Sequence, residues 1–375
     1  MTPFSQKSFN LSDSTSIYPS RLLSSADLEF VDDGHSIDLA ASTRSLLERY
    51  LDYHEENGRR YCRNYYMPND DFEQTRMYLN HQVSLQLLNG EPTTVPLKNP
   101  TKILDIGCGT GDWACQIGER FPNCDVVGKD ISAIQPPSAP HNVFFEVEDA
   151  EEPWLQNPDS VDLVHFRDMV GAFRDWRFIF EQAFECLRPG GYIELQETDD
   201  DGGSWAYICS FFPKESRVHR MTQDLVLAAE RAGRPLGIGH LSRELLEEAG
   251  FVDIKQYRFD IPISLESGSA GQIWLMSCID SVEALGLRLL TRYMDYDPEE
   301  CKTACEQIAQ EMAAIARDPV KAQQMRAHIH IISGRKPDNS TASSRPEKNS
   351  PKAGSPVEQD VLPHSRRLSS ETVRG

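Results

Sequence analysis

The stretch that decides the fold spans residues 103–111 and reads ILDIGCGTG. Apolar residues over 102–106 predict a short buried strand that carries one acid, Asp105. Glycine then occurs at every second position, as Gly107, Gly109 and Gly111. Because glycine has no Cβ, these positions let the backbone turn tightly and approach a ligand closely. The strand, the glycine turn and the helix that follows predict a nucleotide-binding corner.

The spacing of this loop separates two kinds of nucleotide site. A dinucleotide fingerprint reads G-x-G-x-x-G and places a pyrophosphate at the helix N-terminus. Here the pattern is D-x-G-x-G-x-G, and the carboxylate of Asp105 would repel a pyrophosphate. The same carboxylate suits a ligand with a positive sulfonium and an ammonium group. We expect Asp112 to cap the helix that begins at Trp113. The alternative interpretation of the glycine loop is a turn that serves only packing and binds no ligand.

Composition disfavours several classes of function. The chain has 375 residues and a net charge of −20, whereas binding to a nucleic-acid backbone needs clustered Lys and Arg. No apolar run approaches the ~18 residues of a membrane span, and the N-terminus shows no apolar signal region. Nine cysteines without a C-x-x-C pair indicate reduced thiols. We therefore expect a cytoplasmic or nuclear protein without a metal site, a nucleic-acid partner or a membrane anchor.

The chain divides into three parts by composition. Residues 1–40 are rich in Ser, Asp and Thr and are predicted to be disordered. Residues 41–337 are predicted to form one domain, with an N-terminal helical cap over 41–97 and a substrate lid over 198–240. The Ser- and Pro-rich residues 338–375 are predicted to be a disordered tail.

The core of the domain alternates strands and helices, which predicts a parallel sheet with crossovers. The predicted strands are 102–106, 125–128, 143–147, 161–166, 192–196, 251–261 and 327–333. The other predicted helices are 42–51, 70–89, 173–187, 218–232, 243–249, 270–294 and 298–316. The crossover between the second and third strands contains Pro136, Pro137 and Pro140. These prolines forbid an ordinary helix there, so an irregular loop is predicted.

Two more acids follow the next strands, where open α/β sheets bind ligands. Asp130 comes after the second strand and suits a carboxylate that accepts both hydroxyls of a ribose. Asp149 and Ala150 come after the third strand, where a carboxylate and a backbone N–H can hold an adenine. An exposed loop acid is the alternative for each. The glycine loop together with both acids favours S-adenosylmethionine over a dinucleotide.

Several runs resemble the LaeA-like fungal methyltransferases. The N-terminal signature of that family resembles ENGRRYCRNYYMPNDDFEQTRMYLNHQ at 56–82. Further matching runs are LDIGCGTGDWA at 104–114, DISAIQP at 130–136, EDAEEPW at 148–154, DWRFIFEQAFECLRPGGYIELQE at 175–197, EEAGF at 247–251 and GRKP at 334–337. The resemblance covers residues 54–337, most of the folded chain.

The resemblance implies a Rossmann-like class I methyltransferase fold. This α/β fold has a seven-stranded, mostly parallel sheet with a reversed C-terminal hairpin, here with N-terminal helices and a helical lid insertion. It also implies that S-adenosyl-L-methionine binds at Asp105, Gly107, Gly109, Gly111, Asp130, Ile131, Asp149 and Ala150. The N-terminal signature places Tyr65, Arg76 and His81 near the cofactor cleft.

Methyl transfer from a sulfonium is an in-line displacement, so the protein mainly positions the acceptor and excludes water. An oxygen or nitrogen acceptor can also need a general base. His165 and Asp168, around the end of the fourth strand, are the predicted catalytic residues, and His219 and His240 in the lid are weaker candidates. Two functions stay open: a small-molecule methyltransferase of fungal secondary metabolism, and a regulator that acts through protein partners docked on the disordered ends.

Overall fold

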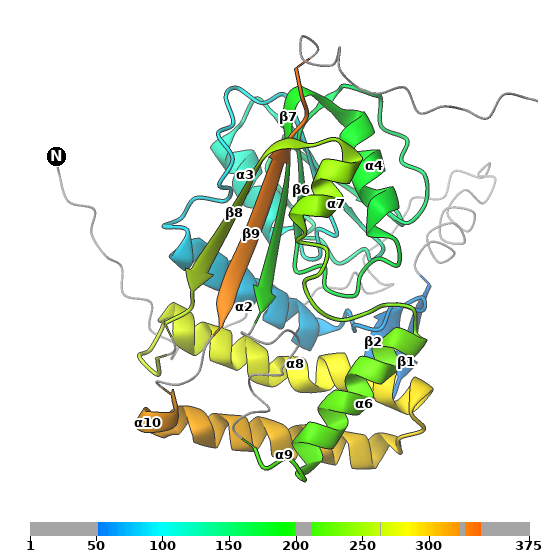
Figure 1. Cartoon of the computed structure of the whole chain (residues 1–375), viewed down its shortest axis with the longest axis vertical. Helices are drawn as coiled ribbons and strands as arrows, with labels where there is room; N and C mark the ends of the chain where they lie inside the picture. Colours follow the sequence, from blue (N-terminus) through cyan, green and yellow to red (C-terminus); the bar gives the residue numbers. More distant parts are fainter. Residues whose placement is uncertain (1–51, 200–211, 263, 323–326, 339–375) are drawn as a thin grey trace, which may run out of the picture. The chain divides into compact units, whose positions relative to one another are not determined.

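The structure is a computed structural model that describes residues 52–199, 212–262, 264–322 and 327–338. In this part of the chain, helices lie on both faces of one large sheet and below it (Figure 1). Three predicted segments lie outside the described residues. They are the disordered N-terminal segment, the helix over 42–51, and the disordered tail except for its first residue, Asp338.

The large sheet has seven strands in the order β5-β4-β3-β6-β7-β9-β8. Only β9 runs antiparallel to its neighbours, and every other pairing is parallel. The strands are β3 (Lys102–Ile106), β4 (Asp125–Asp130), β5 (Val143–Val147), β6 (Val161–Arg167), β7 (Leu187–Asp199), β8 (Val252–Asp260) and β9 (His328–Arg335). This order and the reversed last strand confirm the predicted fold class.

The helices also follow the predicted pattern. They are α2 (Asp71–Leu87), α3 (Asp112–Arg120), α4 (Trp176–Cys186), α6 (Arg217–Arg231), α7 (Arg243–Ala249), α8 (Ala270–Tyr293), α9 (Pro298–Arg317) and the short α10 (Pro319–Ala322). The crossover between β4 and β5 contains no helix, as its prolines predict. Among the described residues, no helix has the length and apolar character needed to cross a membrane.

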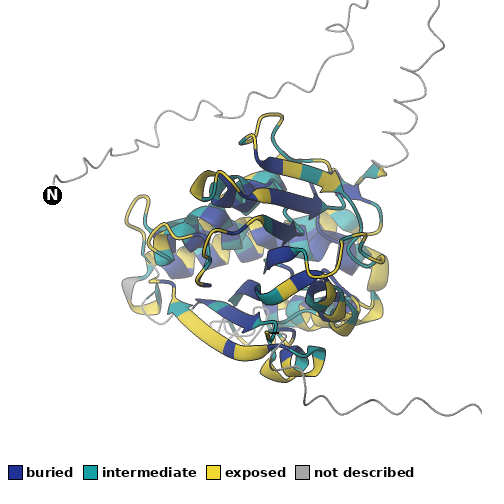
Figure 2. Ribbon diagram, turned by 90° about the horizontal axis from the view of Figure 1, so that it is seen from above, coloured by how far each residue is buried: buried dark blue, intermediate teal, exposed yellow. Residues whose placement is uncertain are grey.

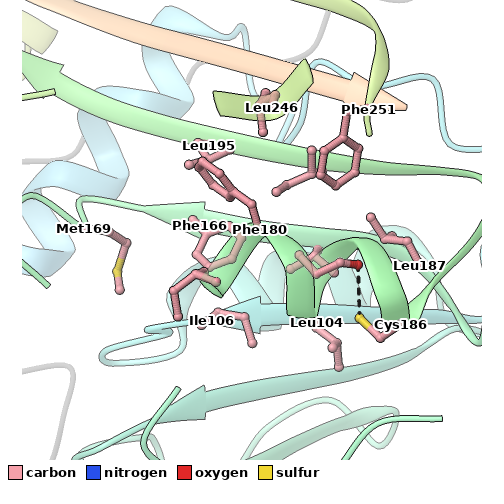
Figure 3. Close-up of a cluster of buried hydrophobic side chains, with 14 of the residues drawn as sticks. Leu104, Ile106, Phe166, Met169, Phe180, Cys186, Leu187, Leu195, Leu246 and Phe251 are labelled. Carbon is pink, nitrogen blue, oxygen red and sulfur yellow. Dashed lines mark hydrogen bonds between the residues drawn. The ribbon is translucent and has the colours of Figure 1, made fainter. Parts of the chain in front are cut away.

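Alternate side chains of the strands pack on opposite faces of the sheet. On one face, Leu104 and Phe166 meet Phe180 of α4 (Figure 3). On the other face, Ile103 packs with Trp113 of α3. Figure 2 shows buried residues concentrated in the strands, as expected for a sheet covered on both sides.

A layer of helices lies at the carboxyl ends of the parallel strands. Helix α8 packs against α2, α6 and α9, and Figure 1 shows this layer below the sheet. Ser269 caps α8 by accepting from the backbone N–H of Gln272, and Asp297 caps α9. The layer therefore covers the edge of the sheet at which the predicted ligand residues meet.

The N-terminal cap is not wholly helical, contrary to the prediction. It starts with an antiparallel hairpin of β1 (Tyr53–Glu56) and β2 (Arg59–Cys62), which precedes α2. Asn57 and Gly58 form the turn with φ values of 54° and 80°. Positive φ at both residues is typical of a two-residue hairpin turn, and Asn-Gly is its preferred sequence.

The starts of α3 and β7 also differ from the predictions. Gly111, with φ 78°, is the N-cap of α3, and Asp112 is the first helical residue, so the predicted Asp112 cap is wrong. The carboxylate of Asp112 instead accepts from the hydroxyl of Thr110 at 2.6 Å. Strand β7 begins directly after α4, because the backbone of Gly190 and Gly191 pairs with Lys336 at the end of β9.

Candidate functional site

The glycine loop after β3 is held in a shape that only glycine fits. Gly107, Gly109 and Gly111 have φ values of 71°, 53° and 78°, which side chains rarely adopt. A Cβ on Gly107 would lie 2.4 Å from Sδ of Met169, and one on Gly111 would lie 2.5 Å from Cζ of Phe145. Gly107 and Gly109 line the adjoining cavity, so the loop brings its backbone to the cavity wall without side chains at these two positions.

Asp130 closes this loop from the end of β4. Its Oδ2 accepts from the backbone N–H of Gly109 at 2.8 Å, and its Oδ1 accepts from that of Ser132 at 2.8 Å. Burial raises the pKa of Asp130 to about 6, although both backbone donors act to lower it. The carboxylate therefore lies against the glycine loop and lines the same cavity.

Asp149 and Ala150 line the same cavity after β5, and so does Ile131 after β4. Both oxygens of the Asp149 carboxylate have partners within the protein. Its Oδ2 pairs with the guanidinium of Arg63 at 3.3 Å, and its Oδ1 accepts from the backbone N–H of Glu151. The structure thus brings the predicted adenine residues to the cavity, with an arginine fixing the acid.

Asp105 is buried beneath the loop, and one of its oxygens has a partner. Its Oδ1 lies 2.8 Å from Nδ1 of His165, while its Oδ2 is buried without a hydrogen-bond partner among the described residues. The ring of His165 stacks on Trp113 with centroids 3.6 Å apart. His165 does not line the cavity, so the geometry does not support the prediction of a general base there. It positions Asp105 instead.

Two carboxylates line the cavity farther from the loop. Asp168, at φ 55° just after β6, accepts from the side-chain amide of Asn80 at 3.2 Å. Glu197, in β7, accepts at Oε1 from the N–H of Met169 at 2.9 Å and from Nε2 of His240 at 2.7 Å. Oε2 of Glu197 is buried and has no partner in the described part of the chain.

Sequence reasoning missed Glu197 as a site residue. A polar residue at the carboxyl end of a central strand was the available signal. Its neighbour His240, a weak candidate, is buried, stacks on Trp176 and reaches the cavity only through Glu197. The other lid candidate, His219, bonds through Nε2 to the carbonyl of Phe212 and does not line the cavity.

The N-terminal signature supplies one wall of the cavity. Tyr65 and Arg76 line it, and Arg76 forms an ion pair with Glu73 at 2.6 Å. His81 does not line the cavity but lies 2.9 Å from a guanidinium nitrogen of Arg167, which does. Two of the three predicted residues therefore line the cavity, and the third contacts a residue that does.

The cavity itself has a volume of about 470 Å³, which is ample for a cofactor-sized ligand. Its walls come from the strand ends and from α2, α6 and α8. Of the predicted lid, residues 198–199, Leu225, Arg234 and residues 236–238 line it, and 200–211 lie outside the described residues. Among the residues described, no cluster of His, Cys, Asp and Glu could hold a metal ion.

These residues fit S-adenosylmethionine. The buried, unpartnered Oδ2 of Asp105 can accept from an ammonium group, which would satisfy an otherwise costly buried oxygen. Asp130 can accept from ribose hydroxyls, and the glycines of the loop place no side chain of their own between its backbone and a nucleoside. A pyrophosphate would meet the carboxylates of both residues, so a dinucleotide fits poorly.

Known proteins point to the same chemistry. The family described as a methyltransferase domain matches residues 45–256. Methyltransferase pytC from Aspergillus terreus is 34% identical and covers 80% of this chain and 91% of the relative. Secondary metabolism regulator LAE1 from Cochliobolus heterostrophus is 33% identical over 64% of this chain and 83% of the relative.

Solved structures include a Haemonchus contortus phosphoethanolamine N-methyltransferase with bound S-adenosylhomocysteine. It shares 16% identity, covers 81% of this chain and 75% of that chain, and has a TM-score of 0.45. The family match and the fungal relatives agree with the glycine loop and the strand order. The chain therefore belongs to the methyltransferase-domain family, among the LaeA-like S-adenosylmethionine-dependent methyltransferases.

Proposed function

We propose that this methyltransferase acts on a small-molecule acceptor in the biosynthesis of a fungal secondary metabolite. The similarity to pytC supports this proposal, because it extends over nearly the whole of that methyltransferase. The cavity also continues beyond the glycine loop to apolar side chains of the helical layer, Leu225, Trp274 and Leu285. Apolar walls with a few fixed polar groups are typical of small-molecule sites.

The observation that carries the proposal is the free oxygen of Glu197. Oε1 is held by two donors, so the carboxylate is fixed, and Oε2 is left buried without one. Such an oxygen calls for a donor from a ligand, because a buried acceptor without a partner is costly. Burial raises the pKa of Glu197, which makes it a better proton acceptor.

S-adenosylmethionine supplies the electrophilic methyl group. In the proposed reaction, a hydroxyl or amine of the acceptor donates to Oε2 of Glu197. Oε2 of Glu197 would take the acceptor proton as the acceptor atom takes up the methyl group that bound S-adenosylmethionine would supply. His240, donating from Nε2 to Oε1, orients the carboxylate. Asp168 is the weaker candidate for this role, because Asn80 already donates to it.

The test uses the purified protein with methyl-labelled S-adenosylmethionine and a metabolite extract from a strain that lacks the gene. We expect label in one small molecule with the wild type and at least about a hundredfold less with Glu197→Gln. Asp168→Asn is the matched control and should retain more activity. Both variants should bind S-adenosylhomocysteine normally by calorimetry. Label that appears in proteins and in no small molecule would refute the proposal.

That last outcome would favour the second candidate function, a regulator that acts through protein partners. The similarity to LAE1, whose name describes a regulator, supports this alternative. The docking segments would then be the two chain ends, and the protein would work in the cytoplasm or the nucleus. Deletion of the gene separates the candidates: loss of one methylated compound indicates a pathway enzyme, and loss of many compounds indicates a regulator.

A further inference from the structure

Five arginines line the cavity, and four of them have an acidic partner. Ion pairs join Arg63 to Asp149, Arg76 to Glu73, and both Arg174 and Arg234 to Glu151. Arg167 is the fifth. Among the described residues, no carboxylate oxygen lies within 4.0 Å of its guanidinium nitrogens. Its positive charge therefore faces the cavity without an anion.

The group that holds Arg167 does not neutralise it. Nη1 of Arg167 donates to Nδ1 of His81 at 2.9 Å, because an arginine cannot accept. His81 is buried, and burial together with the charge of Arg167 lowers its pKa to about 3. The imidazole is thus neutral near pH 7 and orients the guanidinium from one side, which leaves the remaining N–H groups of Arg167 for a ligand.

The strand register places Arg167 on the same face of the sheet as Asp105. Asp105 of β3 pairs with His165 of β6, and Arg167 stands two residues farther along β6. Residues two apart in a strand share a face and are separated by ~7 Å. One face of the sheet therefore carries, at the cavity wall, a carboxylate oxygen without a donor and a guanidinium without an acidic partner among the described residues.

We propose that Arg167 binds the carboxylate of the amino-acid end of S-adenosylmethionine, while Asp105 accepts from its ammonium group. A guanidinium can bond a carboxylate through two parallel N–H groups, which adds orientation as well as affinity. His81 is the positioning residue that holds the guanidinium in place. This assignment concerns the methyl donor alone, and it stands whichever acceptor or partner the protein has.

The test compares three ligands by calorimetry on the full-length protein. S-adenosylhomocysteine carries both charged groups, its decarboxylated analogue keeps the amine, and 5′-methylthioadenosine has neither. We expect Arg167→Met to weaken S-adenosylhomocysteine binding by roughly ten- to hundredfold, the loss typical of a charge-assisted hydrogen bond. The same variant should bind the other two ligands as the wild type does. Arg167→Lys should recover part of the affinity.

Arg120→Met, which removes an exposed arginine of α3, controls for the change in net charge. Equal losses for all three ligands, or no loss for S-adenosylhomocysteine, would overturn the assignment and point to an anionic acceptor at Arg167 instead. If Arg167→Met does not fold, the wild type alone still decides. Equal affinity for S-adenosylhomocysteine and its decarboxylated analogue would then refute a carboxylate contact. None of these results depends on methyl transfer, so the proposed function is tested separately.

Discussion

Cofactor binding should depend on pH through Asp130. In the free protein, burial raises the pKa of this carboxyl to about 6. Ribose hydroxyls donate hydrogen bonds, so they favour the ionised form and lower the pKa in the complex. Binding therefore releases a proton at pH values below about 6, and the affinity for S-adenosylhomocysteine increases as the pH rises through that value.

The magnitude follows from the raised pKa. At pH 5, about nine in ten free molecules carry a protonated Asp130, and at pH 7 about one in ten do. If only the ionised form binds the ribose well, the dissociation constant falls about tenfold between pH 5 and pH 7, or about 1.4 kcal/mol. The ammonium and carboxylate groups of the ligand keep their charges over this range.

The assay is calorimetric titration with S-adenosylhomocysteine at several pH values and constant ionic strength. Repeating the titration in buffers with different ionisation enthalpies measures directly how many protons are released for each ligand bound. Asp130→Asn is the control, and it should bind more weakly and with little dependence on pH. A flat profile for the wild type would refute the ribose assignment. So would an equal slope in the variant, which would assign the titration to another group such as Glu197.

Two further predictions concern the glycine loop and its support. Gly111→Ala forces a side chain to φ 78° against the ring of Phe145, so thermal denaturation should show a loss of about 2–4 kcal/mol and cofactor binding should fall sharply. Gly90→Ala, with φ 81° and open space, should cost only about 1 kcal/mol and leave binding intact. His165→Phe keeps the stacked ring but removes the bond to Asp105, so S-adenosylhomocysteine binding should weaken about tenfold. Normal binding with lost turnover would instead restore a catalytic role for His165.

Most of the fold was predictable because its strands are short apolar runs bounded by turn residues. Strands β3 and β5 have the predicted limits, since β3 stops at the glycine turn and β5 stops before the acid Glu148. Strand β7 was predicted too short, because Pro189 and the two glycines after it usually end an element. Here the backbone of Gly190 and Gly191 continues the pairing of the strand through Lys336, which lies far away in sequence. The missed hairpin had an Asn-Gly turn signal, but its strands lack the apolar alternation that identifies a strand.

The cofactor half of the site was predictable for a topological reason. Acids at the carboxyl ends of adjacent parallel strands must converge, so Asp130 and Asp149 reach the cavity as predicted. His165 was misjudged because sequence position does not show whether a side chain in a buried strand faces a cavity or packs on a helix. Its ring faces Trp113. Glu197 acquires its role only through His240, a residue forty-three positions away.

The sequence also could not predict that Arg167 lacks an acidic partner in the described part of the chain. In the sequence, all five cavity arginines look alike, and a net charge of −20 suggests that any of them would find an acid. Folding pairs four of them and leaves the half-buried Arg167 with a neutral histidine, on the sheet face that also carries the unsatisfied oxygen of Asp105. A buried acceptor without a donor is costly, and Arg167 has no acidic partner among the described residues, so one ligand best explains both groups. A ligand that is positive at one end and negative at the other satisfies both at once, which a neutral nucleoside cannot do.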